Sequence, residues 1–125
     1  MTCSISALTF ANPERNITKT ALRLQESQVE WLDRTIATWN TTLPALNSFA
    51  LPTGSLAATY LHTARAIIRR AEREIVEVAF QEPLTPAIIR YVNRLSDLIF
   101  VLARVENQTG EAEKLWEPGR NAKVA

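Results

Sequence analysis

The chain has 125 residues, of which 46% are hydrophobic, and its formal net charge is +1 with the single histidine neutral. This length supports one domain at most, and the composition is that of a globular protein. The small net charge excludes a general electrostatic field that would attract DNA or a membrane surface, so any anion site has to be local.

Cysteine content and hydropathy indicate the compartment. Cys3 is the only cysteine, so it cannot form an internal disulfide, which fits a reducing environment. No apolar run reaches the ~20 residues of a membrane span, and the first ten residues lack the basic region of a signal peptide. Basic residues do not alternate with aromatic ones, as they do on surfaces that stack bases. We therefore expect a cytoplasmic protein that binds neither membrane nor nucleic acid.

The first part of the chain predicts one clear helix. Residues 1–23 are expected to be irregular or to form a partial helix that Asn12-Pro13 breaks. Ser27-Gln28-Val29-Glu30 then has the spacing of a capping box. The apolar residues that follow recur at helical spacing and predict one buried face: Val29, Leu32, Ile36, Trp39 and Leu43. Pro44 ends this predicted helix.

Two further helices follow a turn region over residues 44–55. Ser55 is the predicted cap of the second helix, and Thr85-Pro86 starts the third with a proline at its first position. The predicted buried face of the second comprises Leu61, Ala64, Ile68, Ala71, Ile75 and Val78. That of the third comprises Val92, Leu95, Ile99 and Leu102. Gly110 is a predicted stop, and residues 120–125 form a tail. Three amphipathic helices predict an all-α, antiparallel helical bundle over residues 24–119.

The second predicted helix carries an ordered stripe of cations. Arg65, Arg69 and Arg73 are four residues apart, so they share one helix face, and Glu72 lies close to that face. Three neighbouring guanidinium groups repel one another unless an anion or a carboxylate lies among them. One interpretation is a site for phosphate oxygens or for an acidic residue of a partner. The other is a solvated face whose Arg–Glu pairs contribute a few tenths of a kcal/mol each.

The third predicted helix carries a second polar stripe, formed by Asn93, Asp97, Phe100 and Arg104. An Asn side chain both donates and accepts, so Asn93 could bind a nucleobase or a hydroxyl, or could pack between helices. For Asp97 the favoured interpretation is a salt bridge to a neighbouring helix.

Several standard sites are missing from the sequence. His62 is the only histidine, which excludes a His-pair metal site, and no residues are assigned as metal ligands. Neither a G-x-x-x-x-G-K-[ST] loop nor a G-x-G-x-x-G loop is present. Three tryptophans are expected in the core or at an interface rather than as stacking platforms: Trp31, Trp39 and Trp116.

Four segments in order resemble a known family. They are Phe49-Ala50-Leu51-Pro52-Thr53-Gly54-Ser55, the block from Arg65 to Arg73, the block from Tyr91 to Arg104, and Leu115-Trp116-Glu117-Pro118-Gly119. Together they are similar to the C-terminal part of the PduO-type ATP:cob(I)alamin adenosyltransferases, over about residues 24–119. This resemblance implies a helical-bundle subunit in a homotrimer, with active sites between neighbouring subunits. It also implies a reaction in which Co(I) of a corrinoid such as cobalamin attacks the 5′ carbon of ATP, with Mg²⁺ as cofactor.

The resemblance also implies roles for individual residues. Arg69 matches the arginine that contacts the triphosphate, and Arg65 matches one that pairs across the interface with an acidic residue. Glu72 and Asn93 match nucleotide-site residues, so the implied ATP site comprises these four side chains. Phe49 matches an aromatic residue that helps displace the lower axial ligand of the corrinoid. Arg69 and Phe49 are thus the expected catalytic residues, and Phe49 is the expected corrinoid contact.

The chain departs from the family pattern in two places. Family members begin with a Thr-Arg-x-Gly-Asp-x-Gly-x-Thr loop that wraps the ATP phosphates, and nothing here matches that loop. In addition, Thr53 stands where the family has a glycine, which predicts a different turn because threonine does not adopt a positive φ cheaply. Two hypotheses follow. The chain is an adenosyltransferase that needs the loop from elsewhere, or it is a non-catalytic remnant that binds corrinoid or a full-length subunit.

Overall fold

The computed structural model describes residues 23–107 and 113–120, and the described part is helical. Its helices are α2 (Glu26–Asn40), α3 (Leu56–Ala79) and α4 (Pro86–Glu106). The expected all-α bundle is therefore confirmed. The predicted stop at Gly110 lies outside the described residues, as does nearly all of the segment predicted to be irregular or partly helical. Within the described ranges, no helix has the length and apolarity that crossing a membrane would require.

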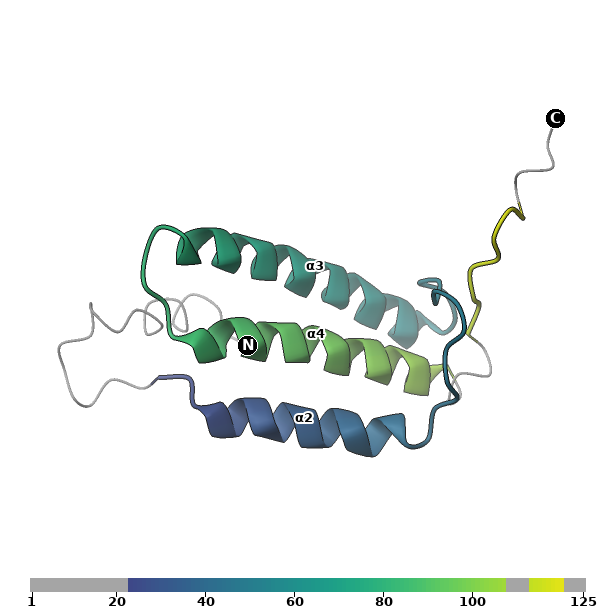
Figure 1. Ribbon diagram of the computed structural model, residues 1–125. Coiled ribbons are helices and arrows are strands. Elements are labelled where there is room, and N and C mark those ends of the chain that lie inside the picture. The colour runs from purple at the N-terminus through teal and green to yellow at the C-terminus, as the bar shows by residue number, and fades with distance from the viewer. Residues whose placement is uncertain (1–22, 108–112, 121–125) are drawn as a thin grey trace.

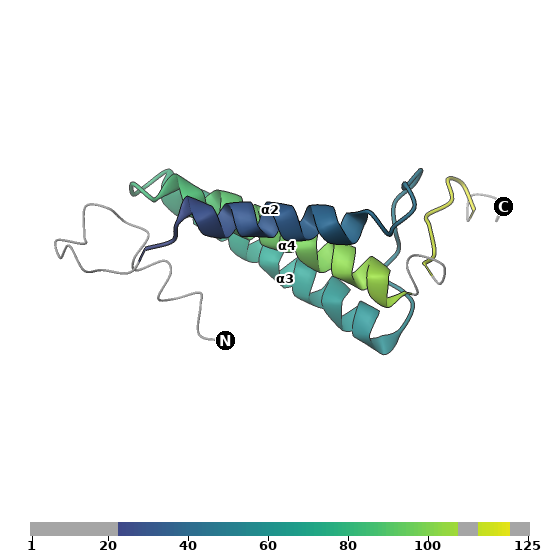
Figure 2. The ribbon, with the colours of Figure 1, turned by 90° about the horizontal axis from the view of Figure 1, so that it is seen from below.

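The three helices lie side by side in roughly one twisted layer, with α4 in the middle (Figures 1 and 2). The principal contacts are those of α4 with α3 and of α4 with α2. Helix α3 runs antiparallel to α4, whereas α2 runs in the same direction as α4 (Figure 1). A single layer leaves much of both outer helices uncovered, and this decides which predicted faces are buried.

Helix starts follow local capping rules, with one correction. Ser55 is the N-cap of α3, where its hydroxyl accepts a hydrogen bond from the amide of Ala58 at 3.1 Å. Thr85 is the N-cap of α4, and Pro86 is its first residue, as predicted. The predicted capping box at Ser27 was wrong, because α2 begins two residues earlier, with Gln25 as N-cap. There the amide of Gln25 donates to the Gln28 carboxamide at 2.8 Å.

The core lies along α4. Val29 and Leu32 of α2 are buried, as predicted, but α2 ends at Asn40, so Leu43 belongs to the following turn. Ile75 of α3 packs against Ile88 of α4 and forms a second cluster. In α4 the predicted face is only partly buried, and the fully buried residues lie beside it: Ala87, Ile88, Ser96, Leu98, Val101, Ala103 and Arg104. Helix α4 packs against α3 on one side and α2 on the other, so more of its surface is buried than the single apolar face that its sequence predicts.

The tryptophans were predicted to lie in the core or at an interface, and the structure shows that they are not core residues. Trp31 and Trp39 point from α2 into solvent, and Trp116 is exposed in the C-terminal segment. On α3, Leu56, Tyr60 and Ile67 are also exposed. These positions lie on faces that a three-helix layer leaves open, so apolar spacing along one helix did not determine which side would be covered.

Candidate active site

The centre of the site is Glu72, whose carboxylate joins α3 to α4. One carboxylate oxygen accepts from the guanidinium of Arg69, and the other accepts from the Asn93 amide at 2.9 Å. The Glu72 side chain is only 13% exposed, whereas that of Arg69 is 46% exposed. The Glu72 carboxylate, which is mostly covered, thus holds the Arg69 guanidinium, while nearly half of the Arg69 side chain is exposed to solvent. That arrangement presents a cation with defined geometry to an anion.

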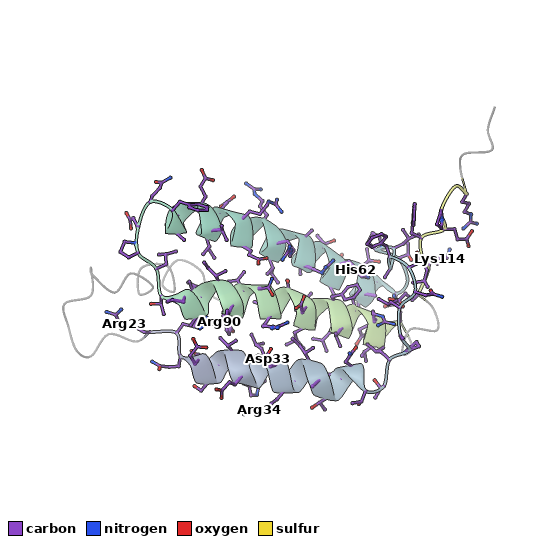
Figure 3. The ribbon with its side chains drawn as sticks, in the orientation of Figure 1. Arg23, Asp33, Arg34, His62, Arg90 and Lys114 are labelled. Atoms are coloured by element: carbon purple, nitrogen blue, oxygen red, sulfur yellow. The ribbon has the colours of Figure 1, made fainter. Side chains whose placement is uncertain are left out.

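A shallow pocket of about 250 Å³ lies beside this bridge, between α2 and α4. Glu72 and Asn93 line it together with Asp33 from α2 and Arg90 and Arg94 from α4. Asp33 faces α4, whereas the neighbouring Arg34 points away from the layer (Figure 3). Val29 and Ile89 also line the pocket, so its wall combines apolar surface with hydrogen-bond donors and acceptors.

Arg65 lies on the same helix as Arg69 but has a different environment. Its guanidinium carbon is 4.8 Å from the centre of the Phe100 ring, a cation–π contact. Its Nε is buried and has no hydrogen-bond partner among the residues that the structure describes. An unpaired buried donor costs free energy, so this group is suited to an acceptor that another molecule brings.

His62 lies one turn before Arg65, between α3 and α4 (Figure 3). Its ring meets Phe100 edge-on at 6.2 Å, and its Nε2 is buried with no hydrogen-bond partner in residues 23–107 and 113–120. Burial lowers the pKa of His62 below its ordinary value of 6.5, the charge of Arg65 lowers it further, and Glu113 acts in the opposite direction. The imidazole is therefore neutral at pH 7 and packs as an aromatic residue.

Phe49 lies in the loop between α2 and α3, and its ring is 78% exposed. The loop is paired with the C-terminal segment through an isolated antiparallel bridge between Ala50 and Leu115. Trp116 donates its amide to the Phe49 carbonyl at 2.7 Å, and the two rings meet edge-on at 6.2 Å. The backbone around Phe49 is thus fixed while its ring stays accessible.

The structure brings some of the predicted site residues together and separates others. Arg69, Glu72 and Asn93 form one hydrogen-bonded group, whereas Arg65 contacts Phe100 and Phe49 contacts Trp116. Arg73, the third cation of the predicted stripe, donates to the carbonyl of Arg69 at 3.4 Å.

The prediction for Asp97 was wrong in its partner. Its carboxylate pairs with Arg94 of its own helix at 3.2 Å. It is Arg94 that reaches the neighbouring helix, where it meets Asp33 at 2.9 Å.

Three buried polar residues near the Phe49 loop had no predicted role: Arg104, Asn107 and Glu113. Arg104 and Glu113 form an ion pair whose side chains are about 5% exposed. Arg104 belonged to the polar stripe of the third predicted helix, but Asn107 and Glu113 carried no periodic signal. Their partners lie far away in sequence, so spacing along a helix did not identify them.

Comparison with known proteins identifies relatives of this chain. The family model for cobalamin adenosyltransferase matches residues 4–106. A cobalamin adenosyltransferase of Cupriavidus metallidurans is 46% identical over 100 residues, which cover 79% of this chain and 54% of that protein. A corrinoid adenosyltransferase of Mycobacterium leprae is 43% identical over 107 residues, which cover 84% of this chain and 55% of that protein. The chain thus spans about half the length of these relatives.

Solved structures show the same arrangement of helices. A phenylalanine-to-histidine variant of a PduO-type ATP:corrinoid adenosyltransferase from Lactobacillus reuteri, complexed with cobalamin and ATP, superposes with a TM-score of 0.76. It is 32% identical, and the match covers 86% of this chain and 58% of that one. An arginine-to-lysine variant complexed with ATP gives a TM-score of 0.69 at 35% identity, over 78% of this chain and 57% of that one.

Proposed function

Because the chain belongs to the cobalamin adenosyltransferase family, we propose that it transfers the 5′-deoxyadenosyl group of ATP to the Co(I) centre of a corrinoid. In this reaction the cobalt electron pair forms a bond to the 5′ carbon. The bond between that carbon and its oxygen breaks, and its electrons leave on the triphosphate. The protein then has two tasks, which are to stabilise the departing polyanion and to keep the corrinoid in a form that can reach Co(I).

The observation that carries the proposal is the anchored guanidinium of Arg69. Negative charge develops on the leaving triphosphate, and a cation fixed before the reaction stabilises it without reorganisation. Glu72 supplies that fixation, and it also orients the Asn93 amide on α4. In this proposal Arg69 contacts the triphosphate, while Glu72 and Asn93 shape the nucleotide site.

The proposal also assigns Arg65 to an interface. Its buried, unpaired Nε supports a carboxylate from a neighbouring subunit as its partner, and the half-buried position favours such a charge pair. The assembly would then be a homotrimer with sites between subunits. The proposal further places the bundle at residues 24–119, with residues 1–23 and 120–125 outside it, and the protein in the cytoplasm.

Phe49 is assigned to the corrinoid. An exposed aromatic ring on a fixed backbone can press against the lower face of a corrin and displace its axial ligand. Cobalt that has lost this ligand is easier to reduce to the Co(I) nucleophile. This is the physical basis for proposing Phe49 as the second catalytic residue.

Mg²⁺ is proposed to enter as a complex with ATP. The described residues contain no group of three or more His, Cys, Asp or Glu side chains that could hold a metal ion. They do not fit a protein-ligated Mg²⁺, and this ion commonly keeps waters and phosphate oxygens as ligands. No step of the proposal depends on a protein ligand to the metal.

A second candidate function is binding without catalysis, to corrinoid or to a full-length subunit. The exposed apolar residues of α3 favour it, because Leu56, Tyr60 and Ile67 form an uncovered face that a partner could bury.

An anaerobic assay separates the two functions. The chain is mixed with ATP, Mg²⁺ and chemically reduced cobalamin, and loss of the Co(I) absorbance is followed. Turnover that stops when ATP is omitted supports transfer. Corrinoid binding without turnover supports the second function, and a chain that neither binds nor reacts contradicts both.

A further inference from the structure

The last turn of α4 buries two polar side chains, Arg104 at 4% exposure and Asn107 at 1%. Burial of such groups is costly unless their hydrogen bonds are satisfied. The Arg104 Nε donates to both carboxylate oxygens of Glu113, at 3.0 and 3.1 Å, and its Nη2 donates to the Pro44 carbonyl at 2.8 Å. One guanidinium therefore ties the start of the Phe49 loop and the C-terminal segment to the same helix.

Asn107 ties the other end of the loop to α4. Its Nδ2 donates to the Thr53 carbonyl at 2.9 Å, and its Oδ1 accepts from the Ser55 amide at 3.0 Å. Between those two residues Gly54 has φ +115°, and a Cβ placed there would lie 1.9 Å from the Asn107 Oδ1. The positive φ that we expected this turn to need is thus at Gly54, and the Asn107 carboxamide occupies the space that a side chain there would need.

Phe49 lies between these two attachment points. The Leu51 amide donates to the Lys114 carbonyl at 2.8 Å, and the Trp116 amide donates to the Phe49 carbonyl at 2.7 Å. Residues 114–116 thus lie against the loop and are hydrogen-bonded to it, and the Arg104–Glu113 ion pair fixes this segment to α4.

We infer that Arg104 and Asn107 are positioning residues that hold the Phe49 ring in its presented orientation. This inference rests on the proposed function, in which Phe49 meets the corrinoid. Both side chains are buried, so they act on the loop and not on the substrate. Binding surfaces gain from anchors that are rigid before contact, and the two ties give an exposed ring this property.

The test uses the full chain with two variants. Asn107→Ala removes both bonds to the loop, and Arg104→Lys keeps a cation for Glu113 but loses the fork that also reaches Pro44. The matched control is Arg120→Ala, whose exposed guanidinium pairs with Glu117, at 3.8 Å, close to the same segment.

The first readout is hydrogen exchange at the Leu51 and Trp116 amides. We expect their protection to fall by about tenfold or more in both variants, since a buried hydrogen bond is worth about that factor. Amides in the middle of α3 and α4 should keep their protection, as should all amides in the control. Unchanged protection at Leu51 and Trp116 in Asn107→Ala would overturn the inference. If that variant fails to fold, Arg104→Lys decides the question by the same criterion.

The second readout is the fraction of four-coordinate Co(II) at saturating corrinoid and ATP, followed by paramagnetic resonance. We expect it to fall in both variants, as in Phe49→Ala, and to stay at the parent value in Arg120→Ala. If the variants lose amide protection but form as much four-coordinate Co(II) as the parent, the hydrogen bonds of Arg104 and Asn107 do not position Phe49. A parent chain that forms no four-coordinate Co(II) would contradict the proposed function, and amide exchange would still decide whether the two residues hold the loop.

Discussion

Glu72 uses its two carboxylate oxygens for two different helices, which makes it the residue on which the proposed nucleotide site depends. It accepts from Arg69 on α3 and from Asn93 on α4. The same carboxylate therefore restrains both a cation and an amide, and the loss of either partner leaves the other in place.

Replacing Arg69 should weaken ATP binding. Arg69→Ala removes a charge-assisted contact worth roughly 1.5–3 kcal/mol, so the affinity should fall by about one to two orders of magnitude. Arg69→Lys should also bind less tightly, because an ammonium does not reproduce the planar fork. Calorimetric titration with ATP measures both. The control is Arg70→Ala, whose exposed side chain pairs with Glu74, and unchanged affinity in Arg69→Ala would refute the assigned contact.

Replacing Phe49 should separate nucleotide binding from cobalt chemistry. Phe49→Ala should leave ATP affinity nearly unchanged, because the ring contacts Trp116 and not the Arg69 group. Formation of four-coordinate Co(II) should decrease, while pre-reduced Co(I) still reacts. Optical and paramagnetic-resonance spectra of the Co(II) complex measure the effect, and an identical four-coordinate fraction in both proteins contradicts the role.

His62 should make the folded state sensitive to acid. Because the pKa of His62 is lowered by burial and by Arg65, the unfolded chain binds the proton more readily than the folded chain. The contribution of His62 to the free energy of unfolding is thus intact above its ordinary pKa of 6.5 and is lost as the pH falls from there toward the folded pKa. Denaturant titration at several pH values should show a smaller loss of stability over this window in His62→Gln. An equal loss in both proteins would assign the effect to other groups.

At the scale of the elements, sequence rules predicted how α3 and α4 begin better than which faces they bury. Ser55, Thr85 and Pro86 act locally, so their positions at the helix starts were predictable. Burial depends on neighbours, and α4 has one on each side. Its single predicted seam therefore missed buried residues such as Leu98 and Val101.

Contacts between residues close in the sequence were also the predictable part of the candidate site, whereas contacts between distant residues were not. Arg69 and Glu72 are three residues apart on one helix, so their pairing follows from helical geometry. The ties of Asn107 to Thr53 and Ser55 join positions more than fifty residues apart, and only the folded chain shows them.

Removing the Ser55 cap should destabilise α3 measurably. Ser55→Ala deletes the hydroxyl that accepts from Ala58, at a cost of about 0.5–2 kcal/mol in the free energy of unfolding. Thr63→Ala is the control, because the hydroxyl of this exposed residue within α3 donates to the Thr59 carbonyl one turn earlier, and the change should stay within about 0.5 kcal/mol. Denaturant unfolding of both variants tests the difference, and equal stabilities would show that the cap contributes nothing.

At the scale of the whole molecule, the single layer of helices should favour association. The exposed apolar residues on α3 and the exposed tryptophans on α2 give the layer uncovered apolar surface, and large surfaces of this kind are commonly binding sites. We expect the isolated chain to self-associate. Light scattering that reports a clean monomer would refute the association.

A charge-matched pair of variants locates the association. Ile67→Lys places a charge on the open face of α3 and should reduce the apparent mass. Gln81→Lys adds the same charge beyond the end of that helix and should not. Equal masses for the two variants would place the contact elsewhere on the chain.

The central position of α4 also has a consequence for the order in which the chain folds. Helices α3 and α4 are joined through residues 80–85 alone, so their contacts need only a short loop to close. Between α2 and α4 the sequence contains the whole of α3 and the long connection at residues 41–55. Bringing α2 to α4 therefore closes a longer loop, which costs more conformational entropy, so we expect this docking step to be slower. We therefore expect the hairpin of α3 and α4 to form first. The hydrogen bonds that hold the Phe49 loop run to the end of α4 and to residues 114–116, so we expect this loop to become ordered with the hairpin, before α2 docks.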